Sequence, residues 1–326
     1  MWSAPIAGSR RRCLSSPTAV DLSTAKSASR SGARDGSRTG NGDTTRNPLE
    51  LRRRRAGGAV FFFHFRTSGS AERPNSGPAL VPRVDELEVA PGLVVTREFA
   101  LWIPEERTAA ISDLHLGFEA ALAEQGVSIP RFHRREILER LRRLLDRYEP
   151  KRLVIAGDFK HEFSRNLVDE WVEIKQVLRF LQARTEPVVV RGNHDNYLAT
   201  ILGDLRMTLH DRYDLAGCTF VHGHEDVASL GTIVLGHEHP AVKLRDVLGA
   251  TVSVPAFLVA DRVIVLPAFS PLALGSSVAS YPYLSPILNR VDVDDARVVG
   301  VDEKEGLLDF GRVADLIEAN ANLLLR

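Results

Sequence analysis

The sequence has few cysteines and no long apolar run, and these two absences exclude several classes of protein. Cys13 and Cys218 are the only cysteines in 326 residues, so the chain can form neither a disulfide scaffold, a CxxC redox pair nor a thiolate zinc site. The most apolar early run, residues 59–65, is far shorter than the roughly 20 residues that span a bilayer. We therefore predict no transmembrane helix and a reducing, cytoplasmic location.

The formal net charge of zero hides two regions of opposite sign. Residues 1–83 hold 15 Lys and Arg against 5 Asp and Glu, which leaves 27 against 37 for residues 84–326. The first region is rich in Ser, Gly and Arg and lacks apolar periodicity, so we predict a disordered basic leader. Translated sequence upstream of the true start is the favoured interpretation, and a nucleic-acid-binding tail is the second. A transit peptide is disfavoured because Gly, Pro and Asp interrupt any amphipathic helix.

From residue 93 onward, strand and helix patterns alternate, as is typical of α/β proteins. Apolar residues at three- and four-residue steps predict amphipathic helices at residues 131–148 and 164–184. Short apolar runs predict strands at residues 93–95, 99–103, 109–112, 153–157, 188–190, 218–223, 232–237, 251–254, 263–266 and 297–301.

Polar side chains follow five of these strands, at the point where each strand ends. In open α/β sheets ligands bind at that edge, because the strands end together and their loops converge. We therefore expect residues that are distant in the sequence to form one cluster. Its candidate members are Asp113, His115, Asp158, Asn193, His194, His222, His224, His237 and His239.

The residue types indicate a metal site. Two aspartates, one asparagine and four histidines are oxygen and nitrogen donors that suit Mn, Fe(II), Zn and related divalent ions, and they are too rich in nitrogen for calcium. Seven ligands exceed the demand of one ion. They fit two ions about 3.5–4 Å apart that share a carboxylate and clamp the oxygens of a phosphoryl displacement.

The motifs "DLH", "GD", "GNHD", "HGH" and "GHEH", in this order over residues 90–275, resemble the signature of the calcineurin-like metallophosphoesterases. The wording "ISDLHLGFEAAL", "AGDFKHEF", "RGNHDNYL", "GHEHPAV" and "PAFSPLALG" is most similar to the stand-alone, archaeal-type SbcD-related phosphoesterases. This resemblance implies that residues 84–326 form a two-sheet β-sandwich flanked by helices. It also implies two divalent ions, with Mn²⁺ ranked before Fe²⁺, Zn²⁺, Ni²⁺ or Co²⁺.

The resemblance further implies a ligand set for each ion. Asp158 would bridge the two ions. The first ion would also be bound by Asp113, His115 and His239. The second would also be bound by Asn193, His222 and His237.

The "GNHD" motif carries the implied catalytic residues. His194 would be the general acid that faces the leaving group, held by Asp195. Taken alone, an aspartate or asparagine after a strand is usually a helix cap or turn former, and for Asp195 the two interpretations have equal support. However, five successive strand ends all carry polar residues of metal-binding types, and capping alone is an improbable explanation for all five. His224 would lie beside the ligands, and the histidines interpreted as structural are His133, His161 and His210.

The implied reaction is hydrolysis of a phosphodiester or phosphomonoester by a metal-bridging hydroxide, without a covalent intermediate. The sequence indicates the substrate less clearly than the type of reaction. The net charge of residues 84–326 does not favour a polyanion, and only 87 residues follow His239, where SbcD-type nucleases carry a further DNA-binding cap. A compact phosphodiesterase is therefore preferred over a Mn²⁺-dependent DNA nuclease. A non-catalytic metal-binding scaffold is the third alternative. No oligomeric state follows from the sequence.

Overall fold

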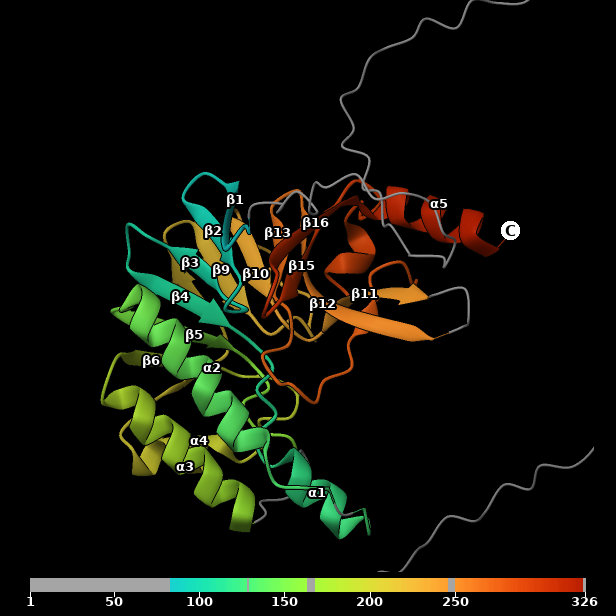
Figure 1. Cartoon of the computed structure of the whole chain (residues 1–326). Helices are drawn as coiled ribbons and strands as arrows, with labels where there is room; N and C mark the ends of the chain where they lie inside the picture. The colour runs from blue at the N-terminus through green and yellow to red at the C-terminus, as the bar shows by residue number, and fades with distance from the viewer. Residues whose placement is uncertain (1–82, 128, 163–167, 246–249, 325–326) are drawn as a thin grey trace, which may run out of the picture. The chain divides into compact units, whose positions relative to one another are not determined.

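The computed structural model describes residues 83–127, 129–162, 168–245 and 250–324. Within these residues two β-sheets and their helices form the fold shown in Figure 1. The leader predicted for residues 1–83 lies outside the described residues, except for Arg83.

The first sheet holds seven strands in chain order. Its strands are β1 (Glu86–Ala90), β2 (Leu93–Thr96), β3 (Leu101–Ile103), β4 (Thr108–Ile111), β5 (Arg152–Ala156), β6 (Glu186–Val190) and β7 (Leu209–His210). Strands β1 to β4 pair antiparallel, whereas β4 to β7 pair parallel. The parallel strands are almost wholly buried apolar runs, because both faces of this part of the sheet are covered.

The second sheet holds nine strands. They are β8 (Tyr213–Leu215), β9 (Cys218–Val221), β10 (Thr232–Leu235), β11 (Pro240–Arg245), β12 (Thr251–Ala260), β13 (Val263–Val265), β14 (Ser276–Ser277), β15 (Arg297–Asp302) and β16 (Gly306–Arg312). The main order is β14-β11-β12-β13-β10-β9-β8, and β15 joins β12 to β16. Within it, β9, β10 and β13 run parallel.

The helices are α1 (Phe118–Glu124), α2 (His133–Tyr148), α3 (Val168–Gln182), α4 (Leu198–Asp204) and α5 (Val313–Leu324), with a 3₁₀ turn at Leu288–Arg290. Helices α2 and α3 lie side by side (Figure 1), and the Arg142 guanidinium of α2 lies 5.5 Å from the Phe180 ring centre of α3. Both helices were expected from their apolar stripes. Among the described residues, no helix has the length and apolar content needed to cross a bilayer.

The two sheets share one apolar core. Ile111 and Val189 of the first sheet belong to the same buried cluster as Phe220 and Phe257 of the second, together with the apolar stripe of α2 around Leu141. A two-sheet β-sandwich flanked by helices is thus confirmed. Its consequence for function is that parallel strands from both sheets end near one another.

Candidate metal centre

The candidate ligands lie where parallel strands of the two sheets end. Asp113, Asp158 and Asn193 follow β4, β5 and β6, whereas His222 and His237 follow β9 and β10. Several contacts join the sheets here, including two that involve the backbone. The His222 Nδ1 lies 3.1 Å from the Ala156 carbonyl oxygen. The His237 backbone N–H donates to the Asp113 carboxylate, 3.2 Å from Oδ2. The structure therefore brings the strand ends into one cluster.

One group of donors surrounds the end of β4. The His239 Nε2 lies 3.2 Å from the Asp113 Oδ1 and 3.2 Å from the His115 Nε2. Asp113 is fully buried and His115 nearly so. These three side chains form a group whose ligand atoms lie within 4.8 Å of one another.

A second group of donors surrounds the His222 Nε2. The Asn193 Oδ1 lies 2.9 Å from it, the His237 Nδ1 3.2 Å and the Asp158 Oδ2 3.3 Å. Donors that each bind one ion at about 2.0–2.1 Å are roughly 3.0–3.4 Å apart, so these separations match a shared cation. The Asp158 Oδ2 is also 3.9 Å from the His115 Nε2, which places this carboxylate between the two groups.

The electrostatics of the cluster suit divalent cations. Burial disfavours a proton on His222, but the hydrogen bond to Asp158 and the charge of Asp113 outweigh it and raise the pKa of His222 to about 9. Positive charge is therefore favoured between the two carboxylates. Burial lowers the pKa of His115 to about 3 and that of His237 to about 4. Burial thus favours the neutral form of His115 and His237, which is the form that binds a metal ion.

The backbone of the cluster is itself unusual. Residues other than glycine seldom adopt a positive φ, because each costs about 1–3 kcal/mol and persists only where its surroundings enforce it. Five candidate ligands have φ between 47° and 67°. They are Asp113, His115, Asp158, His237 and His239. Such concentrated strain is typical of a functional site, since packing alone would not require it.

Glycine permits the close approach of these strands. A Cβ on Gly157 would lie 2.3 Å from the His222 Nδ1, and one on Gly192 would lie 2.1 Å from the Asp158 Oδ1. Any side chain at either position would displace a candidate ligand.

His194 lies on the more open side of the cluster. Its side chain is 27% exposed, whereas that of Asp158 is 3% exposed, and its Nε2 lies 3.9 Å from the Asp158 Oδ2. Its backbone N–H donates to the Asp158 Oδ1 at 3.0 Å. The Nδ1 faces the His161 carbonyl oxygen at hydrogen-bonding distance. The ring is therefore oriented with Nε2 toward the donor groups.

Asp195 contacts the backbone of two loops. Its Oδ2 accepts a hydrogen bond from the Gly192 N–H at 2.8 Å, and its Oδ1 accepts hydrogen bonds from the N–H groups of Phe159 at 2.9 Å and Lys160 at 3.2 Å. These are the bonds of a turn-forming residue, one of the two interpretations that the sequence left open. Asp195 thus fixes the loops after β5 and β6, and through them the place of His194.

Two histidines outside the predicted ligand sets also lie at the cluster. The ring of His161 stacks on that of His194, with centres 5.6 Å apart, and its nitrogen lies within 4.8 Å of those of His115 and His194. His161 was expected to be structural, and its position three residues after Asp158 was the available signal. The ring of His224 lies 5.3 Å from that of His222, as expected for a neighbour of the ligands.

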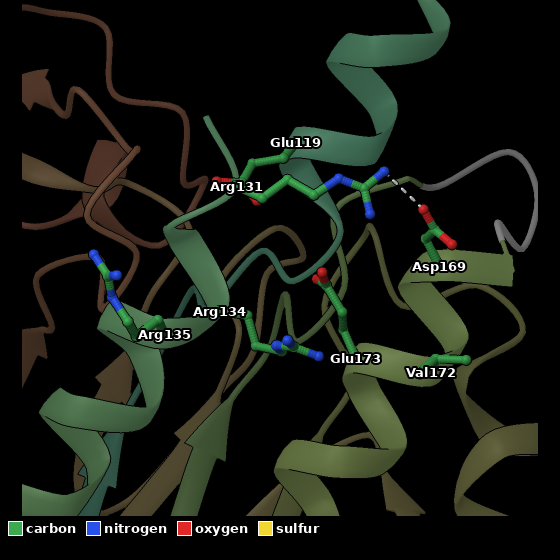
Figure 2. Close-up of a pocket in the computed structure, with 7 residues that line it drawn as sticks. All are labelled: Glu119, Arg131, Arg134, Arg135, Asp169, Val172 and Glu173. Atoms are coloured by element: carbon green, nitrogen blue, oxygen red, sulfur yellow. Dashed lines mark hydrogen bonds and ion pairs between the residues drawn. The ribbon is translucent and has the colours of Figure 1, made fainter. Parts of the chain in front are cut away.

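A separate pocket of about 180 Å³ lies between α1, α2 and α3 (Figure 2). The positive and negative side chains that line this pocket balance one another. Arg131 donates to Asp169 at 2.9 Å, and the Glu119 Oε1 accepts the backbone N–H groups of Phe132 and His133 at the start of α2. The other charged residues that line it are Arg134, Arg135 and Glu173. This pocket offers no excess positive charge to a phosphate ester.

Comparison with known proteins shows the family of the chain. The family model for the calcineurin-like phosphoesterases matches residues 106–294, more than half of the chain, so the chain belongs to the calcineurin-like phosphoesterase family. Among solved structures, it is similar to the Pseudomonas putida nuclease MPE at 22% sequence identity and a TM-score of 0.49, over 64% of this chain and 91% of that one. No curated protein sequence matches the chain significantly.

Proposed function

We propose that the chain is a dinuclear metal-dependent phosphoesterase that hydrolyses a phosphodiester, with His194 as the general acid. The observation that supports it most is the meeting of two donor groups at one buried carboxylate, Asp158. Its resemblance to the SbcD-related branch favours Mn²⁺, and the donors also suit Fe²⁺ or Zn²⁺. When bound, such ions would lower the pKa of a water molecule and draw charge from the phosphoryl oxygens.

The side chains of the site would have separate roles in metal binding and proton transfer. Asp113, His115 and His239 would hold one ion, and Asp158 would be shared with the second group around His222. His194 would keep its Nδ1 against the His161 carbonyl, which leaves Nε2 to give a proton to the departing oxygen. Its exposed fraction of 27% is compatible with contact to a substrate.

The bridging role of Asp158 is testable by metal analysis. Asp158→Asn should reduce the content of both ions, because the amide is a weaker ligand and lacks the negative charge. Asp204→Asn is the matched control, since Asp204 lies in α4 and pairs with Lys175 at the surface. Elemental analysis of the purified proteins measures both. Two full equivalents of metal in Asp158→Asn would contradict a shared carboxylate.

The general-acid role is testable through the leaving group. His194→Ala should keep both ions and lose about 10²- to 10⁴-fold in kcat on an alkyl phosphodiester. It should lose much less on a nitrophenyl ester, because nitrophenolate departs without a proton. His210→Ala, outside the cluster, is the control. Equal losses on both esters together with a lost ion would make His194 a ligand.

The substrate class requires an activity panel with Mn²⁺. An aryl phosphodiester, an aryl phosphomonoester, cyclic nucleotides, single-stranded DNA and duplex DNA ends distinguish the alternatives. We expect turnover of a small phosphodiester. Degradation of DNA at low enzyme concentration would instead make the chain a nuclease, and inertness with both ions bound would make it a scaffold.

A further inference from the structure

A buried ion pair lies beneath the loops that carry the candidate site. The Lys160 Nζ lies 3.4 Å from the Glu170 Oε2, and the two side chains are 0% and 1% exposed. Lys160 follows Asp158 by two residues, and Glu170 lies in the first turn of α3. Neither residue belongs to the donor groups described above.

Stability alone does not account for this pair. Removing two charges from water costs several kcal/mol per ion, and apolar residues of similar volume often stabilise a protein as well or better. A buried pair differs from apolar packing in that its charges demand directed hydrogen bonds. Its partners therefore indicate what it positions.

Those partners include His161, whose carbonyl faces the His194 ring, and the backbone of His194 itself. The Glu170 Oε1 accepts the backbone N–H of His161 at 3.1 Å and that of Glu162 at 2.9 Å. The carbonyl of the same His161 faces the His194 Nδ1. The Lys160 Nζ donates to the His194 carbonyl oxygen at 3.4 Å. The pair thus ties α3 to both sides of His194.

The loop after β4 closes over the same pair. A Cβ on Gly117 would lie 2.5 Å from the Glu170 Cγ and 2.9 Å from its Oε1. Only glycine leaves room for the carboxylate at this position, two residues after His115. Glu170 thus contacts the loops that follow β4 and β5, and Lys160 contacts the loop that follows β6.

We propose that Lys160 and Glu170 are positioning residues for phosphoester hydrolysis, which hold the His194 ring with its Nε2 toward the leaving group. This inference rests on the proposed acid role of His194. It predicts a loss in kcat and little change in KM, because a catalytic group displaced by about 1 Å can lose on the order of 10²-fold in rate while the bound substrate is unaffected.

The test replaces both charges at once. Lys160→Met with Glu170→Gln removes the ion pair and keeps an oxygen that can accept the His161 N–H. We expect both ions to remain bound and kcat on an alkyl phosphodiester to fall at least about 10-fold, with a much smaller loss on a nitrophenyl ester. The matched control is Lys175→Met with Asp204→Asn, a pair that also joins α3 to a neighbouring segment, at 2.7 Å. This control variant should leave the activities on the alkyl and nitrophenyl esters unchanged.

The same variants are then compared in a His194→Ala background. If the pair acts through His194, removing it there should cause no further loss on the alkyl ester. In Zn²⁺-loaded, ¹⁵N-histidine-labelled protein, the Nδ1 proton of His194 should also exchange with water faster once the pair is removed. If the double variant does not fold, Glu170→Gln alone serves for the same comparisons.

Three results would overturn the inference. Equal losses on both esters, with loss of an ion, would make the pair structural. Unchanged activity of the double variant, beside a selective loss in His194→Ala, would refute the positioning role and leave the proposed function intact. No leaving-group selectivity in His194→Ala itself would refute the acid role and the inference together.

Discussion

Acid should destabilise the fold in part through His133, the first residue of α2. This residue is 1% exposed, and its Nε2 lies 2.8 Å from the Ser270 Oγ. Its Nδ1 is buried and has no hydrogen-bond partner among the described residues. Burial, followed by the charges of His161 and Arg140, lowers the pKa of His133 to about 4. A proton on Nδ1 would have no acceptor.

The size of the effect follows from proton linkage. His133 has an ordinary pKa of 6.5 when the chain is unfolded, so between pH 6.5 and about 4 the unfolded state binds more protons than the folded state. The free energy of unfolding is therefore unaffected by His133 above pH 6.5 and falls as the pH drops toward 4. The full loss is about 3 kcal/mol, of which about 2 kcal/mol is reached at pH 5.

Urea unfolding at pH 7.5 and pH 5.0, with saturating metal, measures the contribution of His133 to the free energy of unfolding. Other groups titrate over the same range, so the comparison is between the wild type and His133→Gln, which cannot take up the proton. Between the two pH values, the wild type should lose about 2 kcal/mol more than the variant. His210→Gln, in β7, should behave as the wild type. Equal losses in the wild type and His133→Gln would refute the argument.

Three further outcomes are expected. Gly157→Ala should lose bound metal, since its Cβ would meet the His222 ring at 2.3 Å, whereas Gly203→Ala, with nothing within 4 Å, should retain it, as measured by elemental analysis. Arg140→Met should lower stability by about 1–3 kcal/mol in thermal unfolding, because a buried carbonyl loses its donor. Limited proteolysis should leave a stable, metal-binding fragment that begins near residue 84, and a protease-resistant leader would contradict this.

Apolar periodicity predicted the two longest helices that pack against the core. The helix expected at residues 131–148 is α2, and most of the helix expected at 164–184 is α3, because a buried stripe repeats in the sequence at the period of the helix. The helices α1, α4 and α5 and the strands β1, β7, β8, β11, β14 and β16 were not predicted. Several of them, such as α1, β1 and β14, are short or partly exposed and have too few buried positions to leave a pattern.

The sequence also indicated the donors, because carboxylate, amide and imidazole groups recur where apolar strands end. It could not indicate Lys160 and Glu170. Lysine and glutamate are ordinarily solvated, and only packing between α3 and the loops that follow β4, β5 and β6 removes this pair from water.

By itself, then, the sequence determined the parallel strands, the polar residues at their ends and the chemistry that those residues can perform. These properties depend on local pattern and residue type. The tertiary structure decided that β9 and β10 of the second sheet end against β4, β5 and β6 of the first, which places His222 3.3 Å from Asp158. It also decided that Asp195 bonds to backbone amides while the His161 carbonyl faces His194. Such contacts join residues that are far apart in the chain, and no local pattern records them.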